Sequence, residues 1–543
     1  MKRILTLLAV ALWVGFPAKP VAADRAGEDR TILHVLNRLG FGPRPGDVEA
    51  VRTVGLERYI ELQLHPERID DADMDARTGR LTTVKMSTEE LVRKYEAPLI
   101  EARREQQRRV SAGSQREAPG QAQTAGPGPE LRQLANTPLL EVSEQKLLRA
   151  IYSERQIEEV LTDFWFNHFN VDSRKGPVRF MLTEYERDAI RPHVLGRFRD
   201  LLGATAKSPA MLFYLDNWLS AAPPEARSQG APGRRVLGGR GRGVAIPPRR
   251  GGIRPGQAGP GQGTPGSLPP QAAANMRRGL NENYARELME LHTLGVDGGY
   301  TQQDVTEVAR VFTGWTISQP RQGGGFRFEP RLHDQSDKTV LGHRIPSAGI
   351  SEGEEVLDLL ARHPSTARFI ATKLARRFVS DDPPPALVER AARTFRETDG
   401  DLREVTRVIL TSPEFLSPAA YRAKVKTPLE FVVGAVRATG VEVADARLLV
   451  RAVQTLGMPL YQCQPPTGYR DSADTWANAG ALIGRMNFAL VLANRSATLA
   501  RVPSVEALLG SDVSETTLET IAKASEPAQA LALALGSPEF QRR

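Results

Sequence analysis

Residues 281–315 read NENYARELMELHTLGVDGGYTQQDVTEVARVFTGW, and this stretch predicts two helices joined by a glycine-rich turn. The first helix, over 281–294, ends at Gly295, because glycine readily adopts the positive φ that closes a helix. Thr301 is a natural N-cap for the second helix, and Asp304 follows it at the spacing of a capping-box partner. Apolar residues at helical spacing continue before and after this stretch, so the sequence predicts a predominantly α-helical fold.

Two carboxylates on the polar side of the first helix are candidate catalytic residues. Glu287 and Glu290 lie one helical turn apart, a spacing that suits an acid/base or metal-binding couple. The alternative is structural, and the sequence favours it. Glu282, Arg286 and Glu290 are spaced i, i+4, i+8, so they are expected to form a charge ladder along the helix surface.

The same segment contains two candidate metal ligands, His292 and Asp297. His292 lies about 140° around the helix from Glu287, so the helix alone does not present a Glu–His pair to one metal ion. A histidine in the last turn also interacts with the helix dipole, and that structural role is the favoured one. Asp297 and Asp304 suit a hard cation, but their spacing lacks the alternating oxygen ligands of a calcium loop.

Residues 156–170, QIEEVLTDFWFNHFN, form the aromatic centre of the chain. The apolar side chains follow a helical stripe, which is typical of a core helix. The functional alternative is a ligand-binding surface that includes Trp165 and Asn167. His168 is the leading candidate for a catalytic histidine, with Asn167 and Asp172 close in sequence to orient its imidazole.

Residues 281–315 are called the central motif. Short strands are predicted at its end and beyond it, in a small β-hairpin near 314–343. Trp315, in the first of them, is a candidate ligand-binding residue. His333 is followed by Asp334 in the loop LHDQSD, and such a pair suits a metal site or a general base.

A strong helix is predicted to begin at 363–366, HPST. Lys373, Arg376 and Arg377 lie along its flank. They are expected to pair with the carboxylates of the central helix or with an anionic ligand, and Arg376 is a candidate ligand-binding residue.

The central stretch resembles the signature of a bacterial family known as domain of unknown function 1800 (DUF1800). Six further segments are similar to the same family: HVLNRLGFGPRPGDVEAV, DFWFNHFNV, LHDQSDKTVLG, HPSTARFIATKLARRFV, TPLEFVVGAVRATG and PPTGYRDSADTWANAGALIGRMNFAL. The resemblance implies an exported, mainly helical protein and carries no established activity. Members tend to accompany exported, sulfatase-like proteins of unknown-function family 1501, so the resemblance also implies such a partner.

The first 23 residues have the pattern of a secretory signal peptide. Lys2 and Arg3 precede an apolar core, and Val21-Ala22-Ala23 forms a small-residue cleavage site. The apolar core is shorter than the roughly 20 residues that a transmembrane helix requires. We expect export across the inner membrane with cleavage after Ala23, to a periplasmic or secreted location.

Cys463 is the only cysteine. A single thiol excludes an intramolecular disulfide, so the folded chain must be held by its core. The surrounding sequence, YQCQPPTGY, contains no feature that would lower a thiol pKa. A buried or loop cysteine is therefore favoured over a nucleophile.

The formal net charge of +8 is unevenly distributed. Loss of the leader removes three positive charges and leaves +5. Ten arginines and one glutamate lie within 221–280, so the rest of the mature chain carries −4. This slightly acidic body argues against a nucleic-acid-binding fold, and no specific nucleic acid is expected.

Two segments rich in glycine and proline are predicted to be disordered, a linker at 111–135 and an arginine-rich insertion at 221–275. The insertion is interpreted as a solvated loop or, alternatively, as an arm for an anionic glycan or lipid head group. The helical segments 24–110, 136–220 and 276–543 are expected to form one multi-helix body.

The leading functional hypothesis is an exported envelope protein that binds, and in a specific version hydrolyses, a polymeric or anionic ligand. In that version Glu287 or Glu290 acts as acid/base, and His168, His292, Asp297 or His333 positions water or a divalent metal. The sequence has no nucleophile elbow, HExxH, P-loop or haem CxxCH motif, which excludes several common enzyme classes. The competing hypothesis is a non-catalytic helical scaffold for an exported partner.

Overall fold

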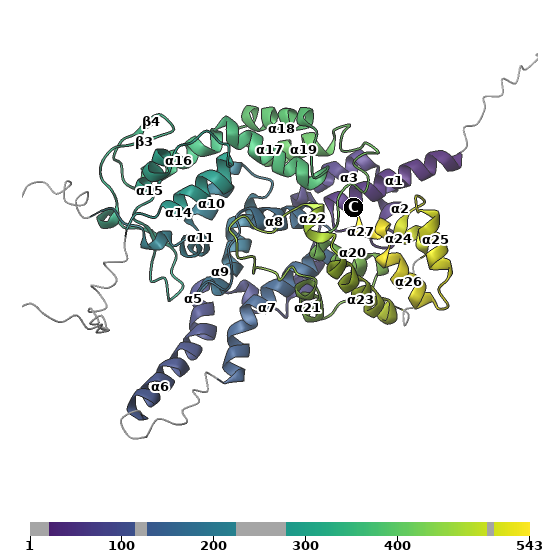
Figure 1. The fold of residues 1–543 in the computed structure, drawn as a ribbon, viewed down its shortest axis with the longest axis horizontal. Coiled ribbons are helices and arrows are strands. Elements are labelled where there is room, and N and C mark those ends of the chain that lie inside the picture. The colour runs from purple at the N-terminus through teal and green to yellow at the C-terminus, as the bar shows by residue number, and fades with distance from the viewer. Residues whose placement is uncertain (1–20, 114–127, 224–278, 497–503) are drawn as a thin grey trace, which may run out of the picture.

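The computed structural model describes residues 21–113, 128–223, 279–496 and 504–543. Most of the leader and the arginine-rich insertion, and the middle of the predicted linker, lie outside these residues. Helices dominate the described part, and its strands form two small two-stranded sheets (Figure 1). The predicted helical fold class is confirmed.

The N-terminal half consists of helices connected by short turns. Its elements are α1 (Val21–Leu39), α2 (Asp47–Val54), α3 (Leu56–Gln63), α4 (Asp73–Thr78), α5 (Thr88–Leu91), α6 (Ala97–Gly113), α7 (Pro129–Tyr152), α8 (Gln156–His168), α9 (Val178–Glu184), α10 (Phe198–Lys207) and α11 (Pro209–Tyr214). Helix α6 and the first turns of α7 extend away from the body of the molecule (Figure 1).

The predicted linker at 111–135 is too long at both ends. Helix α6 continues to Gly113, and α7 begins at Pro129 even though it contains a second proline, Pro138. A proline inside a helix normally interrupts the backbone hydrogen bonds. Pro138 is buried here, so its apolar contacts offset that loss and the helix continues through it.

The second half contains α14 (Glu282–Met289), α15 (Gln302–Val311), β1 (Trp315–Ile317), β2 (Phe326–Phe328), β3 (Lys338–Val340), β4 (His343–Ile345), α16 (Ile350–Arg362), α17 (Pro364–Phe378), α18 (Pro385–Glu397), α19 (Leu402–Leu410), α20 (Pro428–Thr439), α21 (Arg447–Thr455), α22 (Ala473–Trp476), α23 (Ala479–Ser496), α24 (Val505–Leu509), α25 (Glu515–Ala522), α26 (Pro527–Gly536) and α27 (Pro538–Gln541). The single predicted hairpin is in fact two antiparallel pairs, β1 with β2 and β3 with β4.

The central motif folds as predicted, with one addition. Helix α14 continues into a π-helical turn, Glu290–Leu294, that ends at Gly295 with φ of 82°. Thr301 and Asp304 form the predicted capping box at the start of α15. A π-helical turn shifts the register of the side chains that follow it, and such turns are frequent at functional sites.

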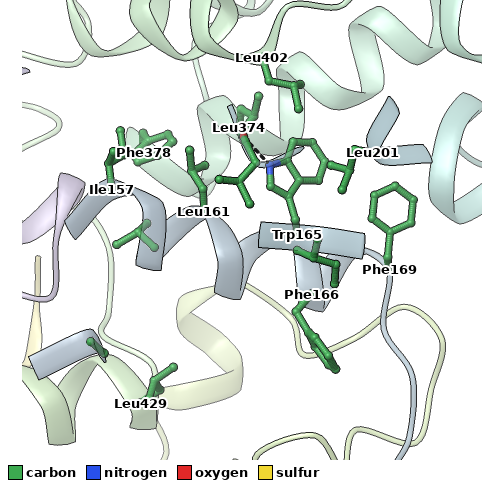
Figure 2. Packing of buried hydrophobic residues seen from close by; sticks show 14 of the residues in the cluster. Ile157, Leu161, Trp165, Phe166, Phe169, Leu201, Leu374, Phe378, Leu402 and Leu429 are labelled. Carbon is green, nitrogen blue, oxygen red and sulfur yellow. Dashed lines mark hydrogen bonds between the residues drawn. The ribbon is translucent and has the colours of Figure 1, made fainter. Parts of the chain in front are cut away.

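One hydrophobic core joins segments from both sides of the insertion. Figure 2 shows Trp165 of α8 packed among Leu201 of α10, Leu374 of α17 and Leu402 of α19. Because α17 and α19 follow the insertion in sequence, the two halves share this core. Within the described residues, none of the helices combines the length and the apolar character that a membrane span requires.

Candidate functional site

His168, the leading catalytic candidate, lies at the end of α8 in a buried basic cluster. Its Nε2 is 3.1 Å from the backbone carbonyl of His292, and its Nδ1 is 2.8 Å from the Lys373 ammonium of α17. A carbonyl accepts only, so Nε2 carries the proton and Nδ1 accepts a hydrogen bond from Lys373. Burial and the nearby Lys373 charge hold the pKa of His168 well below its usual value, so the imidazole is neutral.

The predicted orienting partners of His168 bind elsewhere. The side chain of Asn167 makes two hydrogen bonds to the backbone of Tyr469. Its Nδ2 donates to the Tyr469 carbonyl at 2.8 Å, and its Oδ1 accepts from the Tyr469 N–H at 2.7 Å. Asp172 pairs with Arg174. Proximity in sequence was a poor guide, because Asn167 points about 100° away from His168 around α8 and Asp172 lies beyond the end of that helix.

Lys373 is the unusual member of the cluster. Its side chain is largely buried, yet it donates to a neutral imidazole, and no carboxylate of the described residues lies within 4.0 Å of its ammonium. Burial, together with the charge of Arg376, lowers its pKa to about 8. A lysine in such an environment is a candidate for anion binding or for chemistry at the amine.

Arg376 lies one turn further along α17 and is also partly buried. Its Nε donates to the carbonyl of Asp381 at 2.9 Å, and its guanidinium has no ion pair within the described ranges. The predicted pairing of Lys373, Arg376 and Arg377 with the carboxylates of the central helix is wrong. Arg377 instead forms a buried ion pair with Glu430, 53 residues away in sequence.

Glu287 and Glu290 are half-buried at the edge of this region. Burial and the neighbouring Glu290 raise the pKa of Glu287, while Glu290 accepts a hydrogen bond from the Tyr300 hydroxyl at 3.0 Å. In the part of the chain that the structure describes, neither carboxylate has a hydrogen bond or ion pair to His168.

The predicted charge ladder along α14 is absent, so the structural alternative for these carboxylates also needs correction. Gln302 of α15 lies between the two expected partners: its Oε1 accepts from Arg286 at 2.7 Å, and its amide donates to Glu282 at 2.9 Å. The residues therefore connect α14 to α15 through a neutral side chain, which the spacing within one helix could not reveal.

The three predicted metal ligands lie in different environments. His292 is buried, its ring centre is 6.2 Å from that of His168, and its Nε2 has no hydrogen-bond partner. Asp297 is exposed in the turn, and His333 lies near the second hairpin. No group of three or more His, Cys, Asp or Glu side chains among the described residues is placed to hold a metal ion.

His333 belongs to a buried network that stabilises the hairpin region. Its Nδ1 is 2.9 Å from the carbonyl of Thr313, and its Nε2 is 3.0 Å from a carboxylate oxygen of Glu352. Glu352 also pairs with Lys338 and accepts from the backbone N–H of Gly349 at the start of α16. Glu352 is completely buried and its acceptors are occupied, so the network has a structural role that sequence analysis missed.

The two tryptophans proposed as ligand contacts are fully buried. The Trp165 indole donates to the carbonyl of Val194 at 3.2 Å (Figure 2), and Trp315 packs against Phe312 and Gly353. These positions favour packing roles. Cys463 is also buried, as predicted, and burial raises its pKa to about 11.

Comparison with known proteins gives one match. A family model described as "Protein of unknown function (DUF1800)" matches residues 34–542. No curated protein and no solved structure matches the chain. The matched range includes the His168–Lys373 cluster and the whole central motif.

Proposed function

The chain belongs to the DUF1800 family of proteins of unknown function, and we propose its function from its own residues. We propose that it binds an anionic glycan through Lys373 and Arg376. We propose further that it does so in the bacterial envelope, after export directed by the leader over residues 1–23. The first proposal depends chiefly on one observation, that no carboxylate of the described part of the chain pairs with Lys373.

The donor capacity of the two cations supports this proposal. An ammonium has three N–H donors and a guanidinium has five. One donor of Lys373 is directed to His168 and Nε of Arg376 to a backbone carbonyl, which leaves donors of both side chains for a ligand. A carboxylate or sulfate there would offset the free-energy cost of burying the Lys373 charge.

The position of the arginine-rich insertion adds electrostatic support. The N–H of Ala221 donates to the carbonyl of Gly279 at 3.1 Å, so the described residues on the two sides of the insertion lie at one place. That place is directly before α14, which carries Glu287. In this proposal the arginines of 221–275 raise the local concentration of an anionic polymer around the site.

Replacing Lys373 with methionine tests the binding site. The probe is an oligogalacturonate, a glycan with one carboxylate on each sugar, titrated calorimetrically into the protein at low and at high salt. We expect the affinity to fall by about tenfold, because one charge-assisted hydrogen bond is lost. Lys207→Met is the control, since Lys207 lies on the surface and pairs with Glu354.

An unchanged affinity in Lys373→Met would contradict the proposed site. If the protein binds anionic lipid vesicles but not the oligogalacturonate, the proposed ligand class is wrong. Thermal melting of each variant, measured in parallel, separates loss of binding from loss of folding.

Hydrolysis of the bound glycan is the more specific version of this proposal. Glu287 has a raised pKa, which suits a general acid, and Glu290 lies one turn away. The same probe reports it: wild-type protein should release reducing ends, and Glu287→Gln should not. If wild-type protein releases none, binding remains without hydrolysis.

A scaffold for an exported partner is the second candidate function, and one feature of α23 favours it. Ile483 and Leu490 lie two turns apart on one side of that helix, and they are 64% and 48% exposed. Exposed apolar side chains grouped on one face are typical of protein-binding surfaces. The partner implied by resemblance is an exported protein of unknown-function family 1501.

Co-purification tests the scaffold function. The exported family 1501 protein, expressed with the wild-type chain, should co-purify with it at low salt. Ile483→Glu combined with Leu490→Glu should abolish this association, whereas Ala386→Glu, at an exposed position of α18, should not. If the wild-type chain captures no such partner, the scaffold hypothesis is wrong.

A further inference from the structure

Lys426, directly before α20, is a buried lysine with an unusual environment. It is 4% exposed, and its ammonium has no hydrogen-bond or ion-pair partner among the residues that the structure describes. The ammonium lies 3.9 Å from the centre of the Phe540 ring, which is a favourable contact but brings no negative charge. Burial lowers the pKa of Lys426 to about 7 against the opposing effect of Glu430, so the charged form is costly unless an anion accompanies it.

The lysine borders a small, partly open cavity of about 30 Å³. His34 also lines this cavity, and its Nε2 donates to the carbonyl of Phe415 at 2.8 Å. The other ring nitrogen, Nδ1, is therefore unprotonated, and it is buried without a partner. Burial lowers the pKa of His34 to about 3, so the histidine stays neutral and does not compensate for Lys426.

The surroundings contain more buried cations than carboxylates. Glu430 is the buried carboxylate, and it pairs with Arg377 and Arg543. Asp381 and Asp471, which are partly exposed, pair with Lys424. The buried cations of the cluster are Arg38, Arg377, Lys424, Lys426, Arg485 and Arg543.

Two of the remaining cations interact with neutral groups. Arg38 donates to the carbonyl of Ala420, and Arg485 donates to Gln541 and to the carbonyl of Lys426. Of these six cations, Lys426 is the one with neither a carboxylate nor a neutral acceptor within the described ranges. The excess positive charge therefore coincides at the small cavity with free donors of Lys426 and of Arg543, whose Nε and Nη2 are buried without a hydrogen-bond partner.

A larger cleft adjoins this cavity. Its volume is about 800 Å³, and it lies between α1, the segment that leads into α2, and α24. Leu33, Pro43 and Ala438 line both spaces. The wall shared by the two spaces is therefore apolar.

We propose that the cavity at Lys426 binds one small monovalent anion, either chloride or the carboxylate group of an organic acid whose apolar body occupies the adjoining cleft. The anion accepts hydrogen bonds from the Lys426 ammonium and balances the excess positive charge of the cluster. The small volume excludes a larger polyanion, so this site differs from the glycan site proposed at Lys373.

Thermal unfolding of the full chain in different salts tests the proposal. The starting buffer contains a bulky sulfonate as its anion, and chloride, acetate or octanoate replaces it at constant ionic strength. We expect a saturable rise in melting temperature of roughly 2–3 °C when the anion reaches about 100 times its Kd. Lys426→Met should abolish the rise, and Lys207→Met should retain it.

The pattern of responses distinguishes the two sources of the anion. A response to chloride and acetate alike indicates a bound ion, whereas a much stronger response to octanoate indicates an organic acid in the cleft. Line broadening of ³⁵Cl in the NMR spectrum of the wild-type protein, and its removal by octanoate, gives a second measurement if Lys426→Met does not fold. Equal melting temperatures in all salts and an unbroadened chloride signal would overturn the proposal and indicate a cavity that holds only water.

Discussion

Replacing Glu430 with glutamine is expected to lower the free energy of unfolding by about 3–5 kcal/mol, because removing one member of a buried ion pair leaves the other charge uncompensated. Glu430 is 4% exposed and pairs with both Arg377 and Arg543. It also accepts from the backbone N–H of Thr427 at 2.8 Å, which caps α20. Among the described residues, the variant would leave the buried Arg377 without an anionic partner and Arg543 with only Asp471, 3.7 Å away.

Urea denaturation of the full chain measures this effect. Glu442→Gln is the control, since Glu442 pairs with Arg77 at the surface and such pairs contribute about 0–1 kcal/mol. A loss in Glu430→Gln no larger than that of the control would contradict the interpretation. It would mean that water or an anion compensates the two arginines after the substitution.

The effect of Glu430 should also depend on pH. Its pKa is lowered in the folded protein, mainly by Arg377 and Arg543 against the opposing effect of burial. The folded state therefore binds fewer protons than the unfolded state, and the stabilisation is complete above the ordinary carboxyl value of 4.5. The difference between wild type and Glu430→Gln should shrink as the pH falls below that value.

Replacing Trp165 with alanine should cost about 3–5 kcal/mol of stability, the range for removing a buried aromatic side chain from a core. Trp165 is fully buried, and its indole fills the space between α8, α10 and the helices that follow the insertion (Figure 2). The variant also leaves the carbonyl of Val194 without its donor.

This variant separates the two roles that the sequence left open for Trp165. Denaturation gives the stability, and calorimetry with the oligogalacturonate probe gives the affinity of the folded fraction. We expect a large loss of stability with unchanged affinity, and a smaller loss in the control Phe164→Ala, because Phe164 is only partly buried. Unchanged stability with lost affinity would instead assign Trp165 to a ligand-binding surface.

Local sequence signals were sufficient for much of the fold. Thr301 and Asp304 form their capping box, Gly295 ends the central helix, and α17 begins at Pro364 after the N-cap His363. Each of these features depends on residues within a few positions of one another. The length of the linker was mispredicted because buried contacts carried α7 through Pro138.

The partners of the charged residues were decided only by the tertiary structure. His168 contacts Lys373 across 205 positions of sequence, Arg377 pairs with Glu430 across 53, and Glu352 reaches His333 from the following helix. Spacing within one helix predicts which side chains share its surface, but buried charges pair according to which helices pack together. The sequence by itself therefore determined the family, the helical class and those helix ends that are set by local capping. Only the packing of distant helices decided that Lys373 and Lys426 lie without an anionic partner among the described residues, because the cost of burying a charge depends on every segment that surrounds it.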